Sequence, residues 1–262
     1  MEQIGSLFDD YKILIYYDHS RDDTLKILKE YQQTNPKMLF YVNKSPVSKY
    51  RTHNIANARN FCLDFVKQHI ETFPYFIMMD MDDVNCKDLN VEPLQQSLKR
   101  EDWDGLSFNT SPAYYDIWAL SLYPYCFSYN HYDNNVQFYK IIQEYVTSML
   151  KNLKPGELLP VISSFNGFSI YKTHKFLDTC YDGKVRLDLI PQRNLETHSR
   201  ATGSKLVFKK YVTADCKYED CEHRAFHIQA RQNSGARIMI SPEVLFNPPF
   251  PPFPPLGKVE PK

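Results

Sequence analysis

The sequence predicts an α/β domain in which a mixed, mostly parallel sheet is flanked by helices. Short apolar runs alternate with helical segments over the first 85 residues, and the apolar runs end in polar residues. Buried parallel strands have this appearance, because the intervening helices cover both faces of the sheet. A chain of 262 residues is long enough for one domain with an enzyme-sized core.

The alternation begins with YKILIYYDHS (11–20), a short apolar run typical of a buried strand. RDDTLKILKEYQQ (21–33) has apolar residues near helical spacing and acidic residues in its first turn, which predicts a helix. KMLFYV (37–42) is then expected to form a second strand.

The next unit supplies a helix and a third strand. NIANARNFCLDFVKQHI (54–70) is expected to be helical and YFIMMD (75–80) to be a strand. The helical spacing predicts that one face of this helix is buried, formed by Ile55, Ala58, Cys62, Phe65 and Val66.

After residue 85 the alternation is looser. Four later segments read as strands, the third of them broken by Gly167: WDGLSFN (103–109), YYDIWAL (114–120), VISSFNGFSIYK (161–172) and ARIMISPEVLF (236–246). A helix is expected after an aromatic-rich loop within 123–150, and EDCEHRAFHIQARQ (219–232) is expected to form another. The last segment, NPPFPPFPPLGKVEPK (247–262), reads as a polyproline-II tail.

Composition excludes several classes of partner. Lys plus Arg equals Asp plus Glu, 31 against 31, so charge gives no case for binding nucleic acid or an anionic membrane. The sequence shows neither an apolar run long enough for a transmembrane segment nor a signal peptide. Six scattered cysteines are expected to be reduced thiols, which predicts a cytoplasmic location.

Three aspartates follow the third predicted strand: Asp80, Asp82 and Asp83. Ligands of open α/β sheets collect beyond the carboxyl ends of the strands, where neighbouring carboxylates repel one another unless a cation neutralises them. Oxygen ligands suit Mg²⁺ or Mn²⁺, which readily share a diphosphate. The sequence therefore predicts a divalent-metal site at Asp80 and Asp82, and a solvated acidic turn is the structural alternative.

Two other polar segments accompany these aspartates. In DHSRDDT, Ser20 or Asp22 can cap the following helix, whereas Asp18 is not needed for capping and can hydrogen-bond a nucleobase or ribose. In ANARN, the planar guanidinium of Arg59 can reach a diphosphate at the sheet edge, although a surface salt bridge is its simpler role.

Together, IYYDHSRDDT, ANARNFCLDFV and FIMMDMDD fit one strand–helix–strand–helix–strand layout. Their order and spacing resemble the GT-A glycosyltransferases, which have a Rossmann-like fold, over residues 11–85. The resemblance implies a UDP- or GDP-sugar donor bound with Mn²⁺ or Mg²⁺ and held by a metal-facing pair, Asp80 and Asp82. The donor-binding set that it implies is Asp18, Ser20, Arg59, Asp80 and Gly167.

The later segments follow an order similar to the capsule-associated mannosyltransferase group and its viral and protist relatives. Glu222 aligns with the first acidic position of the GT-A stretch that supplies an acceptor base, and His223 stands where an aspartate is usual. Either group can take a proton from a sugar hydroxyl. Asp116, which lies between Tyr115 and Trp118, is the third candidate catalytic residue and is expected to hold a sugar hydroxyl beside stacked rings.

His223 and His227 lie one helical turn apart, and His227 is a candidate for completing the metal shell. A zinc site that adds Cys216 and Cys221 is an alternative, although its spacing does not match the common structural zinc sites. A core cysteine and a hydrogen-bonded histidine are the simpler interpretation of Cys221 and His227.

The resemblance implies one GT-A domain over 1–246, with a donor half over 11–110 and an acceptor half over 111–246, followed by the tail. GT-A domains usually begin with a strand before the one that ends at Asp18. Here that place is taken by MEQIGSLF, which reads as helical, so either the chain is truncated or another segment fills that edge of the sheet.

Three functions remain open on the sequence. The first is a metal-dependent glycosyltransferase that acts on a glycan or other hydroxyl acceptor. The second is a haloacid-dehalogenase-type phosphatase, with Asp80 as nucleophile and Asp82 as acid/base, although that family places its D-x-D motif near the start of the domain. The third is a non-catalytic glycan-binding protein on a degenerate transferase fold, with the proline-rich tail as a docking segment.

Overall fold

The computed structural model describes residues 1–81, 83–85, 87–208 and 219–246. Within these ranges the strands are β1 (Ile13–Tyr17), β2 (Met38–Val42), β3 (Tyr75–Met79), β4 (Gly105–Asn109), β5 (Leu159–Val161), β6 (Phe168–Lys172) and β7 (Ile238–Val244). The α-helices are α1 (Glu2–Gly5), α2 (Thr24–Thr34), α3 (Arg51–Gln68), α4 (Glu92–Ser97), α5 (Asn135–Lys151), α6 (Gln192–Thr202) and α7 (Glu222–Ser234). Short 3₁₀ turns include η1 (Asp83–Asn85) and η2 (Tyr129–His131).

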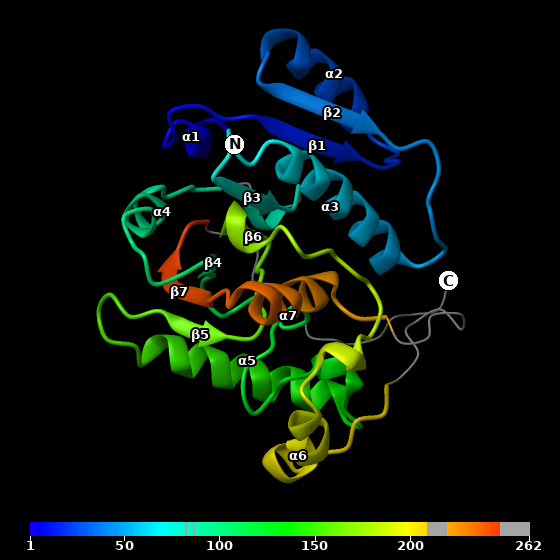
Figure 1. The fold of residues 1–262 in the computed structure, drawn as a ribbon, viewed down its shortest axis with the longest axis vertical. Helices are drawn as coiled ribbons and strands as arrows, with labels where there is room; N and C mark the ends of the chain where they lie inside the picture. Colours follow the sequence, from blue (N-terminus) through cyan, green and yellow to red (C-terminus); the bar gives the residue numbers. More distant parts are fainter. Residues whose placement is uncertain (82, 86, 209–218, 247–262) are drawn as a thin grey trace.

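The described strands form two sheets (Figure 1). The larger has the order β3-β6-β4-β7-β5, in which β4 and β7 pair in parallel and the other neighbours pair antiparallel. It follows that β3, β4 and β7 run in one direction and end at one edge of the sheet. The parallel pair β1-β2 forms a separate sheet. This is the mixed α/β fold with flanking helices that the sequence predicts.

The first half of the chain follows the predicted order closely. The strands at 11–20, 37–42 and 75–80 are β1, β2 and β3, and the two helices between them are α2 and α3. MEQIGSLF contains the short helix α1, as its sequence indicates. In the part of the chain that the structure describes, no strand pairs with β1 on the side opposite β2.

Two hydrophobic clusters cover the faces of the larger sheet. One packs against α3, α5 and α7 and includes Leu63, Phe76 and Phe226. The other packs against α1 and α4 and is centred on Trp103, whose indole N–H donates to the carbonyl oxygen of Ser97 at 2.9 Å. A third, small cluster joins α2 to the β1-β2 pair.

The buried face of α3 differs from the predicted one. The predicted residues, Ile55, Ala58, Cys62, Phe65 and Val66, are all only half-buried. The buried residues, which recur every three or four positions, are Thr52, Ala56, Arg59 and Leu63. Apolar spacing pointed to the wrong face because two polar side chains on this helix, Thr52 and Arg59, have buried partners.

The second predicted strand of the later chain, YYDIWAL, is also not a strand. Residues 114–120 form an irregular segment and a turn, whereas the neighbouring prediction over 103–109 is confirmed as β4. The predicted break at Gly167 separates β5 from β6, and the helix and strand at 219–246 are α7 and β7. The proline-rich tail lies outside the described residues.

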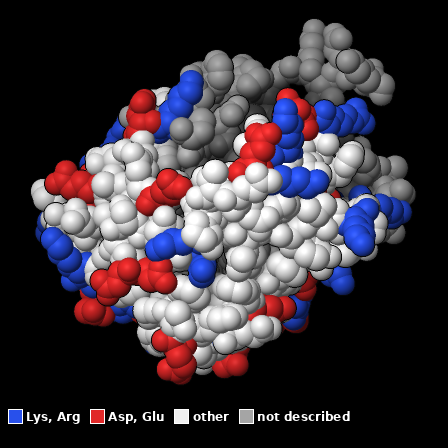
Figure 2. All heavy atoms as spheres, turned by 90° about the horizontal axis from the view of Figure 1, so that it is seen from above, with Lys and Arg blue, Asp and Glu red and all other residues white. Residues whose placement is uncertain are grey.

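Figure 2 shows acidic and basic side chains interspersed over the face that it presents, in keeping with their equal numbers. Within the described ranges, no helix has both the length and the apolar character that crossing a membrane requires. The described cysteines include four free thiols, at Cys62, Cys126, Cys180 and Cys221. The cytoplasmic location stays a prediction.

The buried face of α3 can be tested by cavity formation. Leu63 is 1% exposed, and Leu63→Ala is expected to lower the free energy of unfolding by about 2–5 kcal/mol, because it leaves a cavity in the main cluster. Ile27→Ala on α2 is the control, since Ile27 is 59% exposed. Urea denaturation measures both variants, and equal losses would contradict this assignment.

Candidate functional site

A buried arginine joins three elements at the carboxyl end of β3. Arg59 Nε on α3 donates to Glu222 Oε1 at 2.7 Å, and Arg59 Nη2 donates to Asp80 Oδ1 at 2.7 Å. The side chains of Arg59 and Glu222 are 9% and 5% exposed, whereas that of Asp80 is 39% exposed. The guanidinium therefore links the end of β3 to the start of α7, with Asp80 on the open side.

Aromatic rings complete the surroundings of Arg59. Its guanidinium carbon lies 4.6 Å from the centroid of the Phe165 ring and 6.0 Å from that of Tyr181. Burial by itself would lower the pKa of Arg59, but the charges of Asp80 and Glu222 outweigh it and raise the pKa above its ordinary value. Arg59 is therefore a fixed positive charge at this site.

Two acidic residues just before α7, Glu219 and Asp220, accept hydrogen bonds at its amino-terminal end. Glu219 Oε1 accepts hydrogen bonds from the Thr52 N–H at 3.2 Å and the Thr52 hydroxyl at 2.6 Å, at the first turn of α3. Asp220 Oδ2 accepts from Arg224 Nε at 2.8 Å. The Glu219 and Glu222 contacts hold the amino-terminal end of α7 against α3, whereas the Asp220 bond stays at the start of α7 and orients Arg224.

The turn before β6 positions the two carboxylates Asp80 and Asp116. Asn166 and Gly167 both have positive φ, 62° and 80°. Asn166 Oδ1 accepts from the Tyr115 N–H at 3.1 Å and the Asp116 N–H at 2.8 Å, while the Gly167 carbonyl accepts from the Asp80 N–H at 2.9 Å. One dipeptide thus holds the backbone at both carboxylates.

Gly167 was predicted to bind the donor, but the space beside it is occupied. A Cβ there would lie 2.8 Å from Asn85 Nδ2. That amide nitrogen donates to the Gly167 carbonyl at 2.7 Å. Because glycine has no Cβ, Gly167 leaves room for the Asn85 side chain of η1 and can adopt a positive φ. Its role is therefore structural.

Arg224 holds the other end of the segment that contains Asp116. Its guanidinium donates to the Trp118 carbonyl at 2.6 Å and the Leu120 carbonyl at 3.1 Å. These bonds, together with those from Asn166, satisfy backbone groups that an irregular buried segment would otherwise leave unpaired. Asp116 therefore lies on a turn fixed at both ends.

Asp116 has an environment suited to proton transfer. It is half-buried, and its Oδ1 accepts from the Ala119 N–H at 3.0 Å. Burial raises the pKa of Asp116 to about 6; the Ala119 hydrogen bond opposes this rise, and the charges of Asp80 and Glu222 add to it. Asp116 Oδ2 makes no hydrogen bond within the described residues.

The two predicted histidines are buried. His223 is 1% exposed and stacks on Phe165 at 3.7 Å between centroids, with neither ring nitrogen hydrogen-bonded within the described ranges. Burial, with the charges of Arg59 and His227, lowers the pKa of His223 well below its usual range. His223 is therefore neutral and shielded from solvent.

His227 does not join Asp80. Its Nδ1 is 2.9 Å from the Ser163 hydroxyl and its Nε2 is 3.1 Å from the Tyr171 hydroxyl. Burial lowers the pKa of His227 to about 3. Both ring nitrogens are occupied, so the metal-ligand prediction is wrong for this structure, and the hydrogen-bonded core histidine is the interpretation that holds.

Asp18 and Ser20 lie at the end of β1, in the smaller sheet. Asp18 is exposed, and its Oδ1 accepts from the His19 N–H at 2.9 Å and from Asn43 Nδ2 at 3.3 Å. The Ser20 hydroxyl is 2.8 Å from both the Tyr17 hydroxyl and Asp22 Oδ1. No hydrogen bond between described residues joins Asp18 or Ser20 to the Arg59 group.

Two of the predicted metal-site residues, Asp82 and Cys216, lie outside the described residues. Within the described ranges, no three His, Cys, Asp or Glu side chains are grouped so as to hold a metal ion. Asp80 nevertheless fits one ligand of a hard cation, because its Oδ2 makes no hydrogen bond within those ranges and its side chain is partly exposed.

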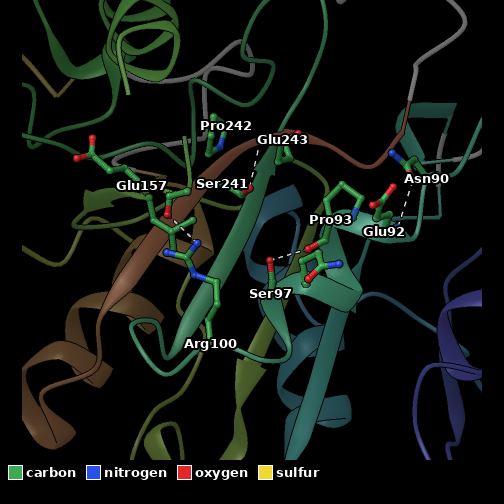
Figure 3. Close-up of a pocket in the computed structure, with 12 residues that line it drawn as sticks. Asn90, Glu92, Pro93, Ser97, Arg100, Glu157, Ser241, Pro242 and Glu243 are labelled. Carbon is green, nitrogen blue, oxygen red and sulfur yellow. Dashed lines mark hydrogen bonds between the residues drawn. The ribbon is translucent and has the colours of Figure 1, made fainter. Parts of the chain in front are cut away.

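A surface pocket, drawn in Figure 3, has a volume of about 360 Å³. It is lined by α4, the segment before β5 and the end of β7, and includes Glu92, Arg100, Glu157 and Glu243. Its arginine is already bonded to Asp102 and to the Gly156 carbonyl. The pocket shares no residue with the group around Arg59.

Sequence reasoning missed Asn166, Asp220 and Arg224, which position the catalytic candidates. Two local signals were available. Asn-Gly favours positive φ at both residues, and an Asp four residues before an Arg at a helix start favours an ion pair. Neither signal indicates which distant segment the side chain holds.

Comparison with models of protein families identifies a match. The family model described as glycosyl transferase family 2 matches residues 2–142, which is more than half of the chain. The matched part runs from α1 into α5 and includes Asp18, Arg59, Asp80 and Asp116, whereas α7 lies beyond it. No curated protein and no solved structure matches this chain.

The buried ion pair can be tested by a double-mutant cycle. Arg59→Met leaves Glu222 buried without a cation and is expected to cost about 3–5 kcal/mol of unfolding free energy. Arg59→Met combined with Glu222→Leu removes both charges, so its cost should be at least about 1 kcal/mol less than the sum of the single costs.

The control cycle uses Arg186 and Asp188, whose side chains are 33% and 61% exposed. Exposed pairs contribute about 1 kcal/mol or less, so this coupling should be the smaller. Urea denaturation measures both cycles. Equal coupling energies would contradict the prediction that the buried Arg59–Glu222 pair is the more strongly coupled.

The raised pKa of Asp116 predicts a pH-dependent effect. Between about pH 4 and pH 6 the folded chain keeps a proton on Asp116 that the unfolded chain has lost, so this group makes unfolding easier as pH rises. Asp116→Asn lacks this titration and keeps an oxygen for the Ala119 N–H. The unfolding free energy of Asp116→Asn minus that of the wild type should therefore increase by roughly 1–3 kcal/mol from pH 4 to pH 7.

Denaturation curves at several pH values measure this difference. Asp64→Asn, at an exposed position on α3, is the control and should show no such change with pH. A difference between Asp116→Asn and wild type that is constant across the range would show that the pKa of Asp116 is not raised.

Proposed function

Because the chain belongs to glycosyl transferase family 2, we propose that it moves a sugar from a UDP- or GDP-sugar to a hydroxyl of a glycan or other acceptor, with a divalent cation. Membership of the family makes it a glycosyltransferase of GT-A fold with a nucleotide-sugar donor and an acceptor. The observation that supports these details is the convergence of Arg59, Asp80, Glu222 and Asp116 at one edge of the sheet. The order of the later segments supports a place near the capsule-associated mannosyltransferases.

The donor half, over residues 11–110, supplies the diphosphate and metal contacts. Asp80, with Asp82, would hold Mn²⁺ or Mg²⁺, which stabilises the negative charge of the leaving diphosphate when bound. Arg59 already donates to Asp80 and has further N–H groups, so it can share its guanidinium with a donor phosphate. Asp18 and Ser20 remain proposed contacts of the nucleotide.

The acceptor half, over residues 111–246, supplies the proton acceptor. The acceptor O–H gives its proton to a carboxylate as its oxygen bonds to the anomeric carbon, while the bond from that carbon to the diphosphate oxygen breaks and its electron pair leaves with the diphosphate. We assign the proton to Asp116, whose Oδ2 is available and whose pKa of about 6 lies near neutrality.

Glu222 and His223 suit supporting roles better. Glu222 Oε1 is held by Arg59 at 2.7 Å and its side chain is 5% exposed, so it neutralises and orients the guanidinium. His223 is 1% exposed against Phe165 and offers no accessible nitrogen. In this assignment both residues position Arg59 and its aromatic surroundings, and Asp116 contacts the acceptor.

The family match and the chain order favour transfer over the phosphatase alternative. Two strand–helix units precede Asp80, whereas the phosphatase motif stands near the start of its domain. A non-catalytic glycan-binding protein on the same fold is the remaining alternative, and the absence of any donor turnover would favour it.

The test is donor binding and turnover by the full chain, with UDP- and GDP-sugars and Mn²⁺. A donor at ten times its dissociation constant should stabilise the fold by about 1.4 kcal/mol, visible as a rise in Tm. The same donor should be hydrolysed or transferred. Asp80→Asn is expected to abolish the Mn²⁺-dependent rise and to lower turnover at least about a hundredfold.

Asp64→Asn is the matched control, because Asp64 is exposed on α3 and makes no hydrogen bond within the described ranges. It should bind and turn over the donor as the wild type does. If no donor raises the Tm and none is turned over, the transferase proposal is contradicted. Hydrolysis of p-nitrophenyl phosphate that depends on Asp80 would favour the phosphatase.

A further inference from the structure

The inference concerns what the site accepts, and it rests on the proposed function. We propose that the acceptor is an uncharged sugar ring, bound by the carboxylate of Asp116 and by the rings of Tyr129 and Tyr139. The two tyrosines come from η2 and α5, which are far from β3 in the sequence. They were not among the residues that the sequence singled out.

The first argument is the fixed position of the carboxylate. Asn166 holds the backbone at Asp116, and its dipeptide partner Gly167 holds the backbone at Asp80. Arg224 fixes the carbonyl of Trp118, two residues after Asp116. A carboxylate held in this way can bind two neighbouring hydroxyls of a ligand without first becoming ordered, which favours binding.

The second argument is the aromatic neighbourhood of Asp116. Tyr129 and Tyr139 are half-buried, and their rings meet edge to face at 5.1 Å between centroids. Gln143 Nε2 on α5 donates to the Tyr114 carbonyl at 3.0 Å and lies 3.5 Å from the Tyr139 hydroxyl, so the tyrosine pair lies beside the segment that carries Asp116. Burial raises the pKa of both hydroxyls, and the charge of Asp116 adds to the rise. Half-buried tyrosines combine an apolar face with a polar end, as an amphipathic ring ligand requires.

The third argument is the number of polar groups there without partners. The Tyr129 hydroxyl makes no hydrogen bond within the described residues, and that of Tyr139 has only a long contact of 3.5 Å with Gln143. The next residue, Asn130, is 6% exposed, and neither polar atom of its amide is bonded in the described ranges. Buried unpaired groups each cost about 1–3 kcal/mol, so a polar ligand or water is expected at this segment.

Charge selects the kind of sugar. Asp116 interacts with the charges of Asp80 and Glu222, and the two nearby arginines, Arg59 and Arg224, are already paired with carboxylates. Among the described residues, the carboxylates of Asp80, Asp116 and Glu222 outnumber these two arginines, so without a bound donor and metal a phosphate or carboxylate on the ligand would be repelled. An uncharged glycoside fits better than a sugar phosphate.

The experiment measures sugar binding without donor or metal. The probes are methyl glycosides of hexoses, N-acetylhexosamines and pentoses, together with hexose 6-phosphates, followed by saturation-transfer NMR and by tryptophan fluorescence. Of the two tryptophans, Trp103 is fully buried in another cluster. If the sugar changes the fluorescence of the wild type but not that of Trp118→Phe, the ligand lies beside Trp118 and therefore near Asp116.

At least one methyl glycoside should bind the wild type, with tenfold or greater loss of affinity in Asp116→Asn and in Tyr129→Ala. Tyr129→Phe keeps the ring and should lose less, which separates ring contact from the hydroxyl. Asp64→Asn is the control and should bind as the wild type does. The Tm of each variant, measured alongside, shows whether the fold is kept.

Three results would overturn the inference: no glycoside binds, the 6-phosphates bind as well or better, or binding is unchanged in folded Asp116→Asn. The donor assay keeps this inference separate from the proposed function. Donor turnover without glycoside binding would contradict only the proposed acceptor site. Glycoside binding that depends on Asp116, without donor turnover, would contradict only the proposed transferase activity.

Discussion

The buried guanidinium of Arg59 is the constraint on which the rest of the site depends. A positive charge that is 9% exposed must be neutralised where it lies, because its transfer from water is otherwise too costly. Asp80, directly after β3, and Glu222 on α7 provide that neutralisation from two directions. Helix α3, strand β3 and helix α7 are therefore fixed relative to one another by a single side chain.

A second constraint comes from backbone groups rather than charges. The segment 114–120 is neither strand nor helix, so its N–H and C=O groups need partners from elsewhere. Asn166 supplies an acceptor at one end, and Arg224 supplies donors at the other. As a result, hydrogen bonds from side chains distant in sequence hold the irregular segment on both sides of Asp116.

Burial also divides the titratable groups by function. It lowers the pKa of His223 and His227, which makes both neutral parts of the aromatic core. The same effect raises the pKa of Asp116 into the range where a carboxylate exchanges protons near neutral pH. An imidazole ordinarily has the pKa best suited to proton transfer near neutral pH. In this fold, burial makes both imidazoles unsuitable for that role.

The sequence by itself determined the order of elements in the first 85 residues, because strand and helix periodicities are local properties of neighbouring residues. It also singled out Arg59, Asp80, Glu222 and Asp116 as chemical groups. Only the tertiary structure decided which face of α3 is buried and that YYDIWAL is a turn, because both depend on polar partners distant in sequence. For the same reason, it alone assigned Glu222 to Arg59, His227 to Ser163 and Tyr171, and Asn85 to the space beside Gly167.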